Sequence, residues 1–149
     1  MSSDEIQIED YFKYYDWNSI TNWTRDPQSP DYYALISNEL IEKGQEVIFT
    51  FEGNIPVDSQ FGISGARDYV SVLRLKKNGT STIHSNTDRT ISIAPQNGDV
   101  FSVKIVGSTA YWYKNGIQIH SNTIKSGGYN IRLLIWYSYS FSMNIKIKS

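Results

Sequence analysis

The sequence predicts an all-β protein, an antiparallel two-sheet β-sandwich of the jelly-roll type. Short stretches in which apolar and polar residues alternate recur along the chain. Turn-forming pairs such as Asn-Gly separate these stretches, as expected for strands joined by hairpins. Helical patterning is nearly missing, since only "NELIEKGQE", which starts at Asn38, fits one or two helical turns, ending at Gly44.

The expected strands follow one another from Glu46 to the end of the chain. They are "EVIFTFEG" at 46–53, "DYVSVLRLKK" at 68–77, "TISIA" at 90–94, "VFSVKIV" at 100–106, "TAYWYK" at 109–114 and the tail "YNIRLLIWYSYSFSMNIKIK" at 129–148. In the tail, residues of one parity are apolar from Ile131 to Ile147, and the other parity is mostly polar. The tail is much longer than a typical strand of roughly 5–6 residues, so we expect a bend or break inside it.

The N-terminal segment, about residues 1–35, has a different pattern. It is rich in aromatic residues, and Pro27 and Pro30 interrupt any regular pairing. We therefore expect an irregular segment that crosses one face or edge of the sandwich. Because no low-complexity linker divides the chain, residues 1–149 are predicted to form a single β-sandwich domain.

One motif occurs twice, as "KNGTSTIHSNT" from Lys77 and "KNGIQIHSNT" from Lys114. Asn-Gly is the strongest short hairpin signal, because a type I′ turn needs positive φ at both central residues. One interpretation is purely structural: the fold uses the same type of hairpin turn twice. The alternative, two paired ligand loops, stays open because turn chemistry explains the repeated His-Ser-Asn-Thr less well than it explains Lys-Asn-Gly.

The amino-acid composition argues against several classes of binding partner. Lys and Arg total 14 and Asp and Glu total 15, giving a net charge of −1, so we expect neither nucleic acid nor an anionic membrane as a partner. There is no cysteine, which excludes disulfides and thiolate metal sites. No apolar run approaches the roughly 20 residues that span a bilayer.

Residues 98–122, "GDVFSVKIVGSTAYWYKNGIQIHSN", carry a resemblance to a known family. This run resembles a hairpin that recurs in concanavalin-like and laminin-G-like jelly rolls of bacterial and phage proteins. The resemblance implies a carbohydrate-binding module of the kind found in phage tail or baseplate proteins and in bacterial surface proteins. It thus implies a virion or an extracellular, cell-surface location and host cell-surface glycans as partners. It supplies no binding residue by itself.

The N-terminal residues contain one candidate catalytic carboxylate pair. In "EIQIE", Glu5 and Glu9 have the spacing of a glucanase carboxylate pair, but Gln7 replaces the central Asp. Retaining hydrolysis needs carboxyl groups roughly 5 Å apart, and two positions four residues apart on a straight strand lie farther from each other. We therefore expect a non-catalytic protein, not an enzyme. No cofactor is expected. Structural calcium is an alternative, because many jelly rolls bind it through Asp and Asn oxygens, although the Asp residues here are scattered and form no calcium-loop motif.

A glycan site needs an aromatic platform beside polar side chains, and aromatic residues make up 14% of the chain. Trp136 has the polar parity of the tail, in company with Arg132, which predicts a face not committed to the core. The ligand-binding candidates are Trp136, Arg132, Trp112, Trp17 and Trp23. The predicted function is non-catalytic recognition of cell-surface glycans. The first alternative is a structural module that packs against other subunits of a virion or surface complex, and the second is a glycoside hydrolase.

Overall fold

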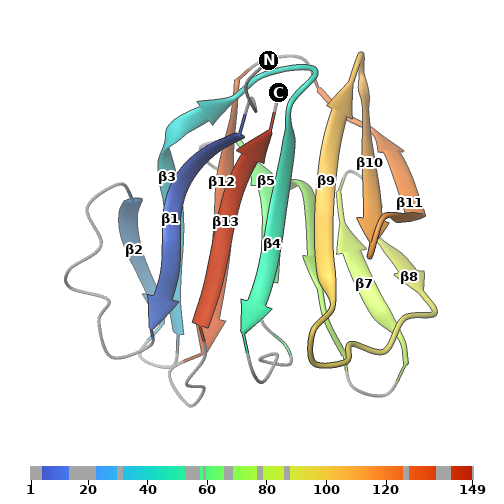
Figure 1. Cartoon of the computed structure of the whole chain (residues 1–149), viewed down its shortest axis with the longest axis horizontal. Coiled ribbons are helices and arrows are strands. Elements are labelled where there is room, and N and C mark those ends of the chain that lie inside the picture. Colours follow the sequence, from blue (N-terminus) through green and yellow to red (C-terminus); the bar gives the residue numbers. More distant parts are fainter. Residues whose placement is uncertain are drawn as a thin grey trace.

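The protein is a sandwich of two antiparallel β-sheets, which confirms the predicted fold class (Figure 1). The computed structural model describes residues 5–13, 23–29, 32–52, 58, 60–65, 69–76, 79–85, 88–125, 128–136 and 142–148. These residues form strands and connecting turns, without a helix. Accordingly, the described part of the chain contains no helix long and apolar enough to cross a membrane.

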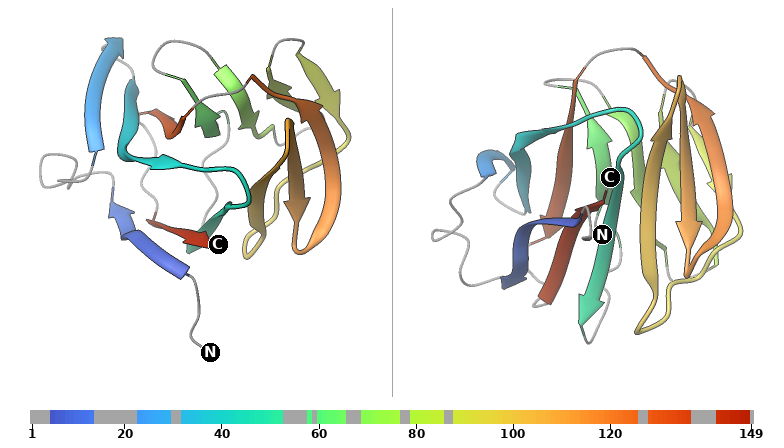
Figure 2. Two further views of the ribbon diagram at one scale, coloured as in Figure 1. Left: turned by 90° about the horizontal axis from the view of Figure 1, so that it is seen from above. Right: turned by 45° about the horizontal axis from the view of Figure 1, so that its top comes forward.

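One sheet has six strands and the other has seven. The six-stranded sheet has the order β1-β13-β4-β9-β10-β11 and the seven-stranded sheet the order β2-β3-β12-β5-β6-β7-β8. Seen from above, the two sheets lie as two layers (Figure 2). The strands are β1 (Glu5–Lys13), β2 (Trp23–Ser29), β3 (Tyr32–Ile41), β4 (Glu46–Glu52), β5 (Gln60–Ser64), β6 (Tyr69–Arg74), β7 (Ser81–His84), β8 (Arg89–Ile91), β9 (Val100–Val106), β10 (Thr109–Lys114), β11 (Ile117–Thr123), β12 (Tyr129–Trp136) and β13 (Ser142–Lys148).

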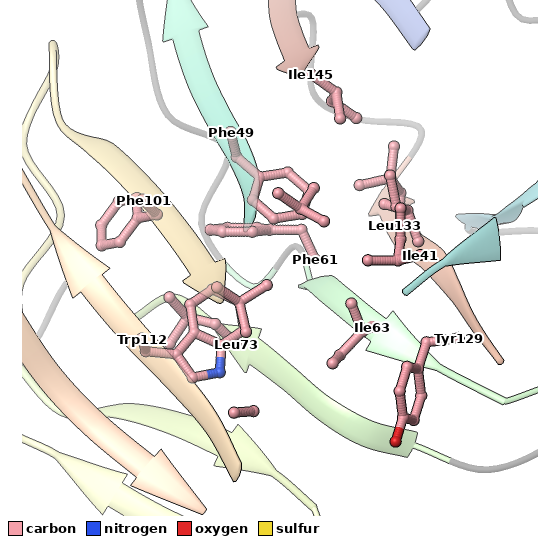
Figure 3. Packing of buried hydrophobic residues seen from close by; sticks show 14 of the residues in the cluster. Ile41, Phe49, Phe61, Ile63, Leu73, Phe101, Trp112, Tyr129, Leu133 and Ile145 are labelled. Atoms are coloured by element: carbon pink, nitrogen blue, oxygen red, sulfur yellow. The ribbon is translucent and has the colours of Figure 1, made fainter. Parts of the chain in front are cut away.

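The core between the sheets is aromatic at its centre (Figure 3). The Phe61 ring centroid lies 4.8 Å from that of Phe49 and 6.1 Å from that of Trp112, and both of these residues belong to the opposite sheet, so the two sheets are in direct contact there. All three side chains are at most 1% exposed. Close contacts of this kind add about 0.5–1.5 kcal/mol per pair to the free energy gained by burying the rings.

The C-terminal tail breaks as expected. Strand β12 ends at Trp136, β13 begins at Ser142, and the two strands belong to different sheets. Ile131 in β12 and Ile145 and Ile147 in β13 are all buried in the common core. One apolar parity therefore serves both strands, because each sheet turns its inner face to the same core.

The N-terminal segment differs from the expectation of an irregular chain over residues 1–35. Strands β1 and β2 and the start of β3 lie within it. Pro27 is accommodated because β2 is an edge strand, where a missing backbone N–H costs little. The β2–β3 register shifts between Asp26 and Ser29, on either side of this proline. The expected helical turns before Gly44 are also wrong, since β3 runs to Ile41 and Gly44 turns the chain with φ 89°.

The second copy of the repeated motif is a tight hairpin. Lys114 pairs with Ile117, so Asn115 and Gly116 are the two turn residues, with φ 52° and 82°. Positive φ at both positions is the type I′ signature that the sequence predicted. In the first copy Gly79 has φ 87°, whereas Asn78 lies outside the described residues.

Candidate functional site

The candidate site is the face of the seven-stranded sheet that is turned away from the core. In β12, Ile131 and Leu133 belong to the core cluster, so Arg132 and Leu134 project from the opposite face. Leu134 is 5% exposed and Arg132 is 7% exposed. An arginine outside the core of a two-layer protein is ordinarily far more exposed, so its burial sets this face apart.

Strand register places polar side chains of four strands next to one another on this face. One row across β12, β5, β6 and β7 consists of Arg132, Gly62, Val72 and His84. The adjacent row on the same strands consists of Leu134, Gln60, Arg74 and Thr82. We call these eight residues, with Ser64 of β5, the polar face. It brings together side chains from residues 60 to 134 of the chain.

The polar face has hydrogen-bonding capacity that the protein does not use. Gln60 Oε1, Ser64 Oγ and Arg74 Nε are buried, and none of them has a hydrogen-bond partner among the described residues. A buried polar atom without a partner costs about 1–3 kcal/mol. Such atoms are rare in folded proteins, and an ordered water or a ligand commonly satisfies them.

Asp58 and Asp88 contact basic side chains at the two ends of the polar face. Lys76 Nζ and Arg74 Nη2 lie 2.5 Å and 3.5 Å from the same oxygen of Asp58, Oδ1. At the other end, His84 Nδ1 lies 3.3 Å from Asp88 Oδ2. The side chains of Arg74, Lys76 and Asp58 are between 32% and 40% exposed, so water screens these pairs and they add little stability.

Gly62 sits in the middle of the polar face because only glycine fits there. A Cβ atom on Gly62 would lie 2.3 Å from the backbone oxygen of Ser71 and 2.7 Å from Cα of Val72, both in the neighbouring strand β6. Real Cβ atoms essentially never come so close to a backbone atom. Because Gly62 has no side chain, the row from Arg132 to Val72 has a gap at its position in β5.

The structure places only some of the predicted site residues. Arg132 lies on the polar face, and register gives Trp136 the same strand parity, opposite Tyr32 of β3. The side chains of Trp136 and Trp23 lie outside the described part of the chain, as does the whole of Trp17. These candidates therefore stay predictions.

Trp112 was wrongly assigned to the ligand site. Its side chain is fully buried in the core, and its indole Nε1 donates a 2.7 Å hydrogen bond to Ser71 Oγ of the opposite sheet. Ser71 Oγ in turn donates to Asn122 Oδ1 at 2.8 Å. Because Trp112 and Ala110 take the inward parity of β10, the flanking tyrosines are the partly exposed residues. Asn122, from the second His-Ser-Asn-Thr copy, thus has a structural role.

Sequence reasoning missed Gln60, Arg74 and Thr82. Strand β5 is short and interrupted by glycine, so "QFGIS" gave no clear alternation. For Arg74 a signal existed, because it shares a parity with Val72 and opposes Leu73 and Leu75, which are in the core. The parity alone did not show which of the two faces was the inner one.

His120 is a described residue whose pKa departs from its usual value. Burial lowers its pKa from the usual 6.5, and the positive charge of Arg89 lowers that pKa further. It pairs with Trp112 across β10 and β11, so it belongs to the six-stranded sheet and not to the polar face. Among the described residues, no group of three or more His, Asp or Glu side chains is arranged to hold a metal ion. Structural calcium stays an untested alternative.

Comparison with known proteins shows the fold. No family model and no curated protein sequence matches the chain. Among solved structures, the galectin LEC-6 of Caenorhabditis elegans matches with a TM-score of 0.53 and 10% identity, over 83% of this chain and 95% of the galectin. The Bacillus licheniformis β-glucanase matches with a TM-score of 0.56 and 12% identity, over 85% and 76%. The Crh5 transglycosylase in complex with NAG matches with a TM-score of 0.58 and 7% identity, over 99% and 86%.

These matches correct the expectation that the chain is not an enzyme. Glucanases and a transglycosylase share its fold, so the fold is compatible with glycoside chemistry. The expectation rested on the failure to find a catalytic carboxylate pair in the sequence. That reasoning was insufficient, because carboxylates that meet in a folded sheet can come from distant strands. The fold is one that galectins and glycoside-active enzymes have in common.

Proposed function

We propose that this protein binds carbohydrate on the polar face of its seven-stranded sheet. The observation that carries the proposal is the set of buried polar atoms on Gln60, Ser64 and Arg74 that lack a partner among the described residues. Sugars present many hydroxyl groups, each of which both donates and accepts hydrogen bonds. Because these atoms are buried in the free protein, a glycan would satisfy the acceptor on Gln60 and the donor on Arg74 once neighbouring side chains move aside. The shared fold with a galectin and with a transglycosylase bound to NAG supports this proposal.

The position of Trp136 adds an aromatic residue to the same strand. Trp136 follows Arg132 by four residues and has the same parity, which separates their backbone positions by about 13 Å along β12. An aromatic ring packs against the apolar C–H face of a sugar while polar groups bind its edge. Arg132 and Trp136 would thus contact different parts of one oligosaccharide.

A glycan array followed by calorimetric titration of the best ligand tests the proposal. Gln60→Ala should weaken binding without unfolding the protein. Gln118→Ala is the matched control, because Gln118 is an exposed glutamine on the other sheet. Equal effects of the two substitutions, or a full array without any bound glycan, would refute the proposed site.

Trp136→Ala separates a ligand platform from a packing residue. Lost glycan binding with an unchanged melting temperature supports the platform. A loss of about 3–5 kcal/mol of stability would make Trp136 a core residue instead. An intact fold with intact binding would remove Trp136 from the site and favour the first alternative, a module that packs against other subunits through its N-terminal strands.

Glycoside hydrolysis is a second candidate, favoured by the glucanase matches. The pair Glu5 and Glu9 does not support it, because Glu5 pairs with Lys148 and Glu9 with Ile145 in β13. Those two partners have opposite parities, and a register shift lies between Gln7 and Glu9, so the register does not place the two glutamates at the same strand parity. Release of reducing ends from β-glucans, measured on wild type and on Glu5→Gln and Glu9→Gln variants, tests whether any hydrolysis depends on them.

We further propose a bacterial cell-surface polysaccharide as the ligand, with the chain acting in a phage tail or baseplate or on a bacterial surface. The support is the resemblance of residues 98–122 to hairpins of such proteins. Binding of fluorescently labelled protein to intact Gram-positive cells tests it, with Gln60→Ala as the negative control. Labelling that is equal for wild type and variant would contradict recognition through the polar face.

A further inference from the structure

Two cations on the polar side of β6 share one carboxylate oxygen. Arg74 ends β6 and projects from its outer side, while Lys76 follows two residues later, beyond Leu75 of the core. Both cations reach the same oxygen of Asp58, so they lie on the same side of the sheet. Lys76 Nζ lies 2.5 Å from Asp58 Oδ1, and Arg74 Nη2 lies 3.5 Å from that same oxygen. Among the described residues, this corner pairs two positive charges with one negative charge, in a chain whose total charge is −1.

Asp58 is held against these cations by the backbone. Its N–H donates a 2.9 Å hydrogen bond to the carbonyl of Leu75, the residue between the two cations. Its φ is 65°, a left-handed conformation that Asp tolerates better than most residues do. The carboxylate is 40% exposed, so its attraction to the cations is screened and it can be displaced at little cost.

Two unused polar atoms lie beside this corner. Arg74 Nε is a buried donor and Gln60 Oε1 is a buried acceptor, and neither has a hydrogen-bond partner among the described residues. Gln60 and Arg74 are direct neighbours in the β5–β6 register. An acidic sugar brings both complementary groups, since its anionic oxygens accept from guanidinium and ammonium groups and its hydroxyls donate to an amide oxygen.

We infer that Arg74 and Lys76 form a subsite for the anionic group of an acidic glycan, and that the carboxylate of Asp58 occupies this subsite in the free protein. On binding, the anionic group of the ligand replaces the Asp58 carboxylate, so the two cations never lose a negative partner. This inference rests on the proposed function and specifies its ligand class. The anionic group is a uronate carboxylate or a phosphodiester, which share charge and acceptor geometry.

The test compares affinities for polygalacturonate, a glycerol-phosphate polymer and neutral dextran at low salt. Asp58→Asn removes the competing charge and keeps the shape, so it should strengthen binding of an acidic polymer by about two- to fivefold. Arg74→Gln and Lys76→Gln should each weaken that binding by a similar factor. Lys104→Gln is the matched control, because Lys104 is a partly exposed lysine on the other sheet. Melting curves of all four variants confirm that each is folded.

The outcomes separate the inference from the proposed function. Tighter binding by Asp58→Asn, lost at about 1 M salt where the Debye length falls to about 3 Å, supports the subsite. The polymer that responds identifies the carboxylate or the phosphodiester as the ligand group. Unchanged or weaker binding by Asp58→Asn, or equal losses for Lys76→Gln and Lys104→Gln, overturns the inference. If dextran or another neutral glycan binds best, the proposed function stands and the acidic-ligand inference falls.

Discussion

The buried hydrogen-bond chain between the two sheets gives the sharpest stability prediction. Ser71 Oγ accepts from Trp112 Nε1 and donates to Asn122 Oδ1, and it is the middle of three side chains that join β6 to β10 and β11. Ser71→Ala removes this middle group and introduces no bulk. The expected result is a clear loss of stability despite the loss of only one oxygen atom.

The size of the stability loss depends on the polar groups that Ser71→Ala leaves without a hydrogen-bond partner. The indole N–H of Trp112 is fully buried, so it loses its partner without gaining water, at a cost of about 1–3 kcal/mol. Asn122 is partly exposed and keeps its bonds from Nδ2 to the carbonyls of Val70 and Thr123, so its contribution is smaller. We expect Ser71→Ala to reduce the free energy of unfolding by about 2 kcal/mol, or roughly 4–8 °C in Tm for a chain of this size.

Ser64→Ala is the matched control, measured by urea denaturation beside Ser71→Ala. Both serines are 0% exposed and lie in the seven-stranded sheet, but Ser64 Oγ has no hydrogen-bond partner among the described residues. Its removal should not destabilise the protein, and should raise the free energy of unfolding by up to about 1–3 kcal/mol, because it removes a buried polar atom without a partner. Equal losses for the two variants would refute the reasoning. A double-mutant cycle of Trp112→Phe and Ser71→Ala that gave no interaction energy between the two residues would also refute the reasoning.

Three further predictions concern other parts of the fold. Gly62→Ala should cost about 1–3 kcal/mol through the clash with the neighbouring strand, whereas Gly65→Ala, with nothing within 4 Å, should be nearly neutral in the same denaturation assay. Gly116→Val should cost about 1 kcal/mol or more because φ is 82°, and an unchanged Tm would argue against the type I′ turn. Because burial and Arg89 lower the pKa of His120, its neutral form stabilises the fold above about pH 6.5, and this stability is lost as the pH falls toward the lowered pKa. His120→Gln should therefore flatten the fall of Tm between pH 7 and pH 5, and a parallel fall would contradict this origin.

Sequence periodicity was sufficient for the parts of the fold where one face is apolar and the other polar. The tail is the clearest example, because the parity that contains Ile131 and Ile147 is the buried one in both of its strands. The N-terminal strands escaped detection because Pro27 obscured the pattern of β2. A proline argues against a central strand, but sequence alone does not distinguish a central strand from an edge strand, and β2 is an edge.

The candidate site was less predictable than the fold, for a physical reason. Its side chains come from β12, β5, β6 and β7, and strand pairing alone brings them together. Arg132 was found because it shares the polar parity of the tail with Trp136, but Gln60 and Asp58 carry no local signal. Trp112 shows the opposite error, since a tryptophan between two tyrosines fits an exposed aromatic patch and a core position equally well until the parity of β10 is known.

The positions of the last two strands bear on how the chain is synthesised. Strand β13 lies between β1 and β4, and β12 lies between β3 and β5, so each joins segments made much earlier by the ribosome. Without β13, strand β1 has no neighbour in its sheet among the described strands, and without β12 the β2–β3 pair is detached from β5. Neither sheet can close until residues 129–148 have left the exit tunnel. The earlier strands must therefore wait with unpaired edges during translation, the state in which β-rich chains most readily aggregate.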